Sequence, residues 1–168
     1  MTELENSRAE KDDFFARHPQ SPLTAAQKRT FTGLRYFDEN PALRLTLTVD
    51  LFSAREQIEI QTSTGDARVY VRFGRFKFLV DGQEAELTIY ETEHGFFLPF
   101  VDSLAGAETY PAGRYLDPEL LPGGRFLVDF NLAYNPYCAY NDAWSCPLTP
   151  FENRLKVPIR AGEKLFHE

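Results

Sequence analysis

The chain has 168 residues, 43% of them apolar and 26% charged, and its formal net charge is −7. This length is enough to bury one hydrophobic core, and the 15 Phe and 8 Tyr favour β-sheet. The negative charge argues against a nucleic-acid partner, because such proteins usually present a basic surface to phosphates. No apolar run reaches the roughly 20 residues of a spanning helix, and the acidic start is unlike a secretory signal. We therefore expect one cytoplasmic domain, residues 1–168, with no nucleic-acid or membrane partner.

The N-terminal segment, residues 1–30, is predicted to be a helical appendage of one or two short helices. Glu, Lys, Ala and Arg dominate it, and Ala, Glu, Lys and Arg are good helix formers. The second helix has two alternative starts: Ser21 as an N-cap before a proline, or a capping box between Thr24 and Gln27. The phenylalanines of the segment are expected to dock it onto the rest of the chain.

Residues 34–168 are predicted to form a β-rich body. Beyond Gly33 the hydrophobic pattern changes from helical to alternating, which indicates strands with one buried face. The first of these is expected to bury one continuous apolar face, formed by Leu43, Leu45, Leu47, Val49 and Leu51. Short alternating runs recur about every ten residues along the body. The pattern predicts a mainly β fold, an antiparallel β-sandwich or small barrel of about seven or eight strands.

Two turn signals organise the middle of the chain. Asp81-Gly82 is the strongest hairpin signal, because both central residues of a type I′ turn need positive φ. Gly74-Arg75 shifts the phase of the alternation by one residue, so it marks either a tight hairpin or a β-bulge. The sequence leaves these two possibilities open.

The segment from Tyr110 to Arg154, called here the polar-aromatic block, is unusually dense in hydrogen-bonding and aromatic residues. Ligand pockets join apolar walls to a few convergent polar groups, so this block is the candidate site. Its candidate ligand-binding residues are Arg114, Tyr115, Asn131, Tyr134, Asn135, Tyr140, Trp144 and Asn153. The fork of Arg114 would suit a carboxylate or phosphate, which favours a small anionic ligand. The structural alternative is a long ordered loop in which Asn131 and Asn153 only brace the backbone.

An enzymatic role would need a nucleophile, for which Cys138 is the candidate. Such a cysteine requires a base and a carboxylate close in space, and His94 and Asp129 are the candidates. Nothing in the spacing demands this arrangement, and most cysteines flanked by aromatic residues are small buried hydrophobes. In a reducing cytoplasm Cys138 and Cys146 are expected to be free thiols. Two cysteines without a CxxC pair and three histidines do not match a zinc site, so we expect no metal and no cofactor.

Several motifs resemble a known family. They are FVDSLAGAETYPAGRYL, then VDFNLAYNPYCAYNDAWSCPLTPFENRLKVPIRAGEK, together with KDDFF, SPL and FTGLRYF near the start. In this order they are similar to the signature of the DUF1684 family of uncharacterised bacterial and archaeal proteins, over nearly the whole chain. The activity of that family is unassigned, so the resemblance supplies no catalytic residues.

The interpretation that the sequence favours is a small-molecule-binding β-domain, with its pocket formed where the polar-aromatic block closes over the sheet. One alternative is a hydrolase-type enzyme that uses the same pocket. The other is a non-catalytic structural or protein-interaction module, because a fold by itself does not define a function. The ligand and the oligomeric state stay open.

Overall fold

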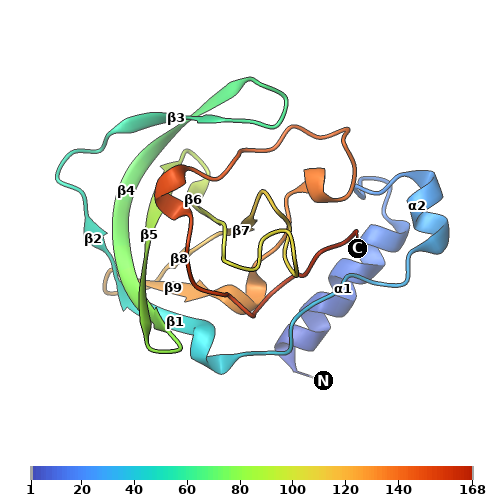
Figure 1. Ribbon diagram of the computed structural model, residues 1–168, viewed down its shortest axis with the longest axis horizontal. Helices are drawn as coiled ribbons and strands as arrows, with labels where there is room; N and C mark the ends of the chain where they lie inside the picture. Colours follow the sequence, from blue (N-terminus) through green and yellow to red (C-terminus); the bar gives the residue numbers. More distant parts are fainter. Residues whose placement is uncertain (1, 168) are drawn as a thin grey trace.

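The computed structural model describes residues 2–167 as two antiparallel sheets with a pair of helices at one side (Figure 1). The helices are α1 (Glu3–Arg17) and α2 (Ala25–Thr30). The strands are β1 (Arg44–Thr48), β2 (Asp50–Leu51), β3 (Gln57–Gln61), β4 (Ala67–Val80), β5 (Gln83–Thr92), β6 (Gly95–Phe100), β7 (Arg114–Leu116), β8 (Glu119–Leu120) and β9 (Arg125–Asp129). Single 3₁₀ turns form at η1 (Pro41–Leu43), η2 (Phe130–Leu132), η3 (Tyr137–Ala139) and η4 (Phe151–Asn153).

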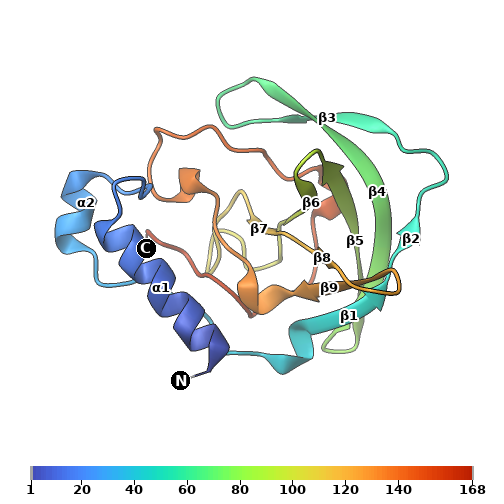
Figure 2. The ribbon, with the colours of Figure 1, turned by 180° about the vertical axis from the view of Figure 1, so that it is seen from behind.

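The larger sheet has the order β2-β4-β5-β6-β7, with β3 also paired to β4, and the smaller sheet has the order β1-β9-β8. The main core lies between them, because both sheets contribute buried side chains to one cluster, among them Phe76, Leu87, Leu98, Phe126 and Val128. Figure 2 shows β1 and β9 of the small sheet running across the lower part of the curved large one. Within the described residues the sheets do not close into a barrel, so the sandwich-like alternative is the one that the chain adopts.

The β4–β5 hairpin confirms both turn signals. Asp81 and Gly82 have φ of 50° and 80°, and Val80 pairs with Gln83, as a type I′ turn requires. Gly74 lies at a β-bulge inside the continuous strand β4, where the register shifts between Arg72 and Gly74. A Cβ at Gly74 would lie 2.6 Å from the Val49 side chain, so glycine is needed where β2 approaches. The tight-hairpin alternative at this position is therefore wrong.

The expected continuous face from Leu43 to Leu51 is wrong at its end. Leu43 and Val49 are buried, but Leu51 is 59% exposed. The chain changes sheets at Val49, because β1 pairs with β9 whereas β2 pairs with β4. Alternating residues share one buried face only as long as the chain stays in the same sheet.

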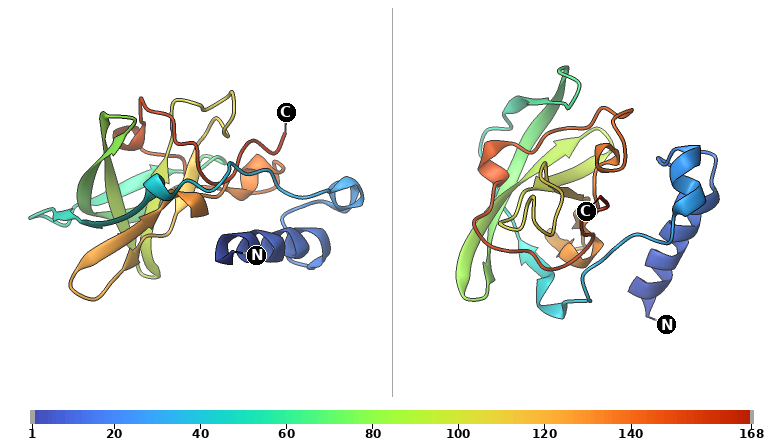
Figure 3. Two further views of the ribbon diagram at one scale, coloured as in Figure 1. Left: turned by 90° about the horizontal axis from the view of Figure 1, so that it is seen from below. Right: turned by 45° about the vertical axis from the view of Figure 1, so that its right-hand side comes forward.

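The two helices form a separate layer beside the sheets (Figure 3). Of the two predicted starts of α2 the capping box is correct, since Thr24 and Gln27 exchange backbone-to-side-chain hydrogen bonds. Ser21 is not the N-cap; its hydroxyl donates to the Phe15 carbonyl. Phe15 packs with Leu23 and Tyr140 in a small cluster that docks the helices. In the described chain, neither helix has the length and apolar character to cross a membrane.

Candidate ligand-binding site

Two asparagines of the polar-aromatic block bond to the backbone of neighbouring segments. The Asn153 side chain accepts from the Thr88 N–H at 2.8 Å and donates to the carbonyls of Thr88 and Pro99. The Asn131 side chain accepts from the Asn40 N–H at 2.8 Å and donates to the Asn40 carbonyl. Both residues are buried, and each side chain supplies partners to backbone groups outside the sheet ladder. These contacts match the bracing role of the structural alternative.

Arg114 lies in the interior, where only 1% of it is exposed. Its guanidinium donates to the carbonyls of Ile159, Ala161 and Glu163, and it lies 3.7 Å from the Asp102 carboxylate. Burial lowers the pKa of Arg114 to about 10, although the charges of Asp102 and Glu163 oppose the change. The group is therefore still charged at neutral pH, and its donors are occupied by the C-terminal segment. The expectation of an anionic ligand required an Arg114 guanidinium that is available to bind it, so the expectation loses its basis.

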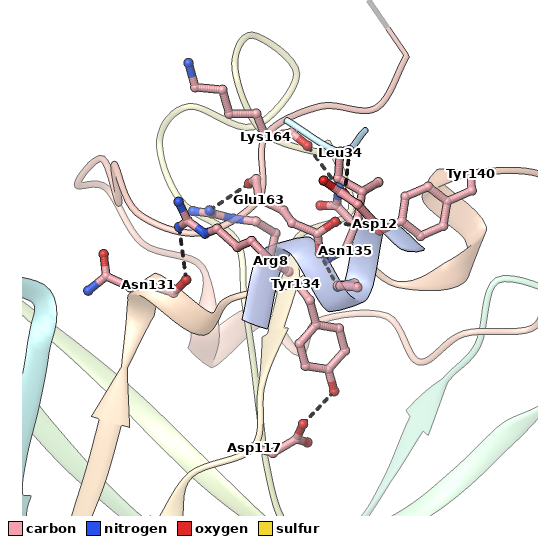
Figure 4. A network of polar contacts seen from close by, with 12 residues as sticks. Arg8, Asp12, Leu34, Asp117, Asn131, Tyr134, Asn135, Tyr140, Glu163 and Lys164 are labelled. Carbon is pink, nitrogen blue, oxygen red and sulfur yellow. Dashed lines mark hydrogen bonds and ion pairs between the residues drawn. The ribbon is translucent and has the colours of Figure 1, made fainter. Parts of the chain in front are cut away.

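Glu163 joins α1, the polar-aromatic block and the C-terminal segment through one buried carboxylate (Figure 4). It accepts hydrogen bonds from Lys11 Nζ at 2.8 Å, the Asn135 N–H at 2.8 Å and the Tyr140 hydroxyl at 2.7 Å. Burial, together with the charge of Glu163, raises the pKa of Tyr140 well above its ordinary value. Tyr140 thus remains a neutral donor, and its hydroxyl is occupied within the protein.

The three catalytic candidates have separate sets of partners. Cys138 Sγ lies 3.2 Å from Ser63 Oγ and donates to the Trp144 carbonyl. His94 is in the exposed turn between β5 and β6, with its ring 3.6 Å from Glu93. Asp129 accepts from Asn131 and pairs with Arg44 at 3.2 Å. No hydrogen bond of the described residues joins the three into a nucleophile, base and carboxylate. Between residues 2 and 167 there is also no group of three His, Cys, Asp or Glu placed to hold a metal.

A second aromatic cluster forms on the outer face of the large sheet. Strand β4 contributes to this cluster because of its bulge. Before the bulge Arg72 pairs with Tyr90, and after the bulge Gly74 pairs with Ile89, the residue next to Tyr90. Neighbouring residues of β5 point to opposite faces, so the first half of β4 turns its buried side chain, Tyr70, away from the main core. Phe97 on β6 and Tyr115 on β7 join Tyr70 and Tyr90 in this cluster. Because of this one bulge, β4 contributes side chains both to the main core and to the candidate site.

The polar-aromatic block closes over this outer cluster and leaves a pocket of about 320 Å³, which is within the usual range for small-molecule sites. Half of its lining residues are aromatic, namely Tyr70, Phe97, Tyr115, Tyr134, Tyr137 and Trp144. Neighbouring rings lie 4.8 to 5.8 Å apart, from the stacked pair Tyr70–Phe97 to the edge-on pair Tyr115–Tyr134. Four of the eight predicted binding residues meet here, namely Tyr115, Tyr134, Asn135 and Trp144.

The hydroxyls of the pocket are oriented by the protein. Tyr115 donates to the Pro147 carbonyl, and Tyr134 donates to Asp117 at 2.9 Å. Burial raises the pKa of both tyrosines, and for Tyr134 the charge of Asp117 adds to the effect. Tyr115 and Tyr134 are therefore neutral at physiological pH, and their hydroxyls are held in fixed orientations.

Asn135 lines the pocket, and one of its polar atoms has no hydrogen-bond partner. Its backbone N–H donates to Glu163, and its side-chain nitrogen donates to the Lys164 carbonyl at 3.0 Å. Its side-chain oxygen is buried without a hydrogen bond to any described residue. A buried acceptor without a partner is uncommon and costs stability, so it indicates a missing donor from water or ligand.

The comparisons with known proteins establish the family. The model of the family described as "Protein of unknown function (DUF1684)" matches residues 29–164. The chain belongs to the DUF1684 family. Its fold resembles the solution NMR structure of an uncharacterised protein from Haloarcula marismortui, with 37% sequence identity and a TM-score of 0.71. That match covers 98% of this chain and 94% of the other chain. No curated protein matches.

The resemblance drawn from the motifs of this DUF1684 protein is thus confirmed. On the sheet side of the pocket, sequence reasoning named Tyr115 but missed Arg68, Tyr70 and Phe97. The phase shift at Gly74 was a signal for Tyr70, because it implied that the two halves of the strand face opposite ways. Glu163 was also missed; its partner Lys11 is far away in the sequence, so no local pattern connects them.

Glu152 of the DUF1684 chain forms an ion pair beside the outer cluster. Arg72 contacts its carboxylate through two nitrogens, at 3.1 and 2.7 Å, and Tyr90 donates a further hydrogen bond at 2.5 Å. Burial raises the pKa of Glu152, but the bonds from Arg72 and Tyr90 outweigh it, so the pKa is lowered overall. A carboxyl whose pKa falls on folding stabilises the protein above its unfolded-state pKa and loses that contribution as pH falls through the folded value.

We therefore expect Glu152→Gln to lower the free energy of unfolding by about 1 kcal/mol at pH 7, a value reduced for solvent screening because Glu152 is partly exposed. The difference between wild type and variant should shrink as the pH falls below the ordinary pKa of glutamate. Urea unfolding at neutral and acidic pH measures it. A difference that stays constant with pH would show that the ion pair does not stabilise the fold.

Proposed function

We propose that this DUF1684 protein binds a small molecule that carries a ring and a hydrogen-bond donor, in the aromatic pocket between the polar-aromatic block and the outer face of the large sheet. The observation that carries the proposal is the combination of six aromatic walls with the unpartnered side-chain oxygen of Asn135. Rings attract the flat face of another ring, whereas the Asn135 oxygen needs a donor, which a ligand supplies when the side chain turns toward the pocket. One ligand that has both features satisfies the pocket.

The surroundings of the pocket leave room for ligands of different sizes. A larger groove of about 830 Å³ adjoins the pocket and shares Arg68, Tyr70 and Phe97 with it. The groove carries the carboxylates of Glu91 and Asp117, whereas Arg68 donates to the Ser145 carbonyl at the rim. Charges of both signs are thus within reach, so the proposal specifies a ring and a donor and no net charge. A longer substituent of the ligand would extend into the groove.

Titrations with the matched compounds phenol and anisole, followed by amide NMR, test the two required features. The compounds share a ring, but only phenol has an O–H donor for Asn135. We expect both to shift pocket amides such as those of Phe97 and Ser145, and phenol to bind more tightly. A single added hydrogen bond is worth about 1 kcal/mol, which corresponds to a ratio of about five in affinity. Shifts confined to residues outside the pocket would contradict the proposal.

Tyr137→Ala provides the corresponding test on the protein. Tyr137 is at the rim, 37% exposed, with its ring 5.1 Å from that of Trp144, so its loss leaves the core intact. Loss of one aromatic contact should weaken phenol binding by about 1 kcal/mol, or about fivefold. The matched control is Phe151→Ala, because Phe151 is an aromatic residue 87% exposed outside the pocket. Equal affinities in the two variants would argue against binding at this place.

A further inference from the structure

The two cysteines of the chain meet at one serine hydroxyl beside the pocket. Cys138 Sγ lies 3.2 Å from Ser63 Oγ, and the Cys146 N–H donates to the same oxygen at 3.1 Å. The Cys138 sulfur is therefore no more than two hydrogen-bond lengths from the Cys146 backbone. Ser63 also donates its own N–H to the Cys146 carbonyl at 2.9 Å, which fixes the arrangement from the β3–β4 hairpin.

The two thiols differ in access. Both are free; Cys138 is partly exposed, whereas Cys146 is buried and lines the aromatic pocket. Burial, together with the adjacent Cys138 thiol, raises the pKa of Cys146 to about 11. A reagent in solution thus reaches Cys138 first, since thiol reactivity follows exposure and thiolate content. Cys146 is placed to react second, inside the protein.

We propose that Cys138 and Cys146 form a redox modification site, which closes to an intramolecular disulfide on reaction with a low-molecular-weight disulfide such as oxidised glutathione. The Cys138 thiolate attacks one sulfur of the small disulfide, forms a mixed disulfide and releases one small thiolate. Cys146 sulfur, deprotonated in this step, then attacks the Cys138 sulfur and releases the second small thiol. The protein is oxidised by two electrons, and two glutathione thiols carry away its two thiol hydrogens.

The disulfide would act on the rim of the pocket. Cys138 Sγ donates to the Trp144 carbonyl at 3.0 Å, and oxidation removes that donor. Trp144 and Ser145 line the pocket between the two cysteines in sequence, so closing the disulfide rearranges this part of the wall. The effect on ligand affinity rests on the proposed binding function, whereas the disulfide itself does not.

Intact-mass analysis after treatment with oxidised glutathione, followed by denaturation and iodoacetamide, tests the site. We expect the wild-type chain to lose two hydrogens, to carry no glutathione and to take up no iodoacetamide. Cys138→Ser and Cys146→Ser cannot complete the second step, so Cys146→Ser should retain a glutathione adduct on Cys138. Reduction should restore the original mass. Wild type that keeps both thiols, or accumulates the same adduct as Cys146→Ser, would overturn the proposal.

Trp144 reports the consequence for the pocket, because it is the single Trp of the chain. Its fluorescence should change when the wild type is oxidised and should stay unchanged in Cys146→Ser under the same treatment. A disulfide without this change would remove the link to the pocket rim. Neither readout uses a ligand, so failure of ligand binding and failure of the redox site are distinguished.

Discussion

Replacement of Arg114 by Gln is expected to lower the free energy of unfolding by about 3–5 kcal/mol, the usual range when one partner of a buried ion pair is removed. The Arg114 side chain is 1% exposed, and its guanidinium donates to the carbonyls of Ile159, Ala161 and Glu163. Gln is shorter and has one amide group, so it leaves some of these carbonyls and the Asp102 carboxylate without donors. Urea unfolding followed by circular dichroism measures the loss.

Two further variants serve as comparisons for this prediction. Arg114→Lys keeps the charge but lacks the planar fork, so it should also destabilise the protein, though less than Gln does. Arg160→Gln is the matched control, because the Arg160 side chain is 54% exposed and lies 3.9 Å from Glu108. Surface changes of this kind usually alter stability by less than about 0.5 kcal/mol. If Arg114→Gln were as stable as Arg160→Gln, the interior guanidinium would not hold the C-terminal segment.

Glu163→Gln is expected to lower the free energy of unfolding by about 2–3 kcal/mol. Gln removes the charge that Lys11 faces and replaces one acceptor by a donor opposite Asn135 N–H or Tyr140. The loss is smaller than for a fully buried pair because the Lys11 side chain is 31% exposed. Since Lys11 belongs to α1, the variant should also expose the helices to proteases at concentrations that leave the wild type intact. Urea unfolding and limited proteolysis measure the two effects.

The control for this network is Glu108→Gln, whose carboxylate is 44% exposed and pairs only at 3.9 Å with Arg160. It should change neither stability nor proteolysis by a measurable amount. Lys11→Met separates the two contributions of Glu163, since it removes the ion pair but leaves Asn135 and Tyr140 bonded to the carboxylate. Equal behaviour of Glu163→Gln and Glu108→Gln would contradict the view that Glu163 joins α1 to the body.

Much of the fold was predictable because local rules decided it. Asp81-Gly82 specified its turn through positive φ, and Thr24 with Gln27 was one of the two helix starts that the sequence offered. The error at Leu51 has the opposite origin, because β1 and β2 pair with different sheets and only tertiary structure reveals that. The short strands β2 and β8 also could not be predicted, because two residues are too few to show an alternating pattern.

The candidate site was predictable by region but less so by residue. The block was correctly marked as dense in polar and aromatic groups, yet Arg114 and Asn153 have their polar groups bonded inside the protein, whereas Tyr134 and Trp144 line a pocket. Residue type does not separate these roles, because a buried brace and a binding group need the same hydrogen-bonding chemistry. Burial and partners decide between them, and both depend on contacts distant in sequence.

Native mass spectrometry of the protein incubated with a small-molecule extract of its own cells tests the binding proposal most directly. Wild type, Tyr137→Ala and Phe151→Ala are compared, each in native and denatured form. The proposal predicts an excess mass on wild type and Phe151→Ala that disappears on denaturation and is reduced for Tyr137→Ala. No excess mass on the wild type, or the same excess on all three proteins, would contradict ligand binding in the aromatic pocket.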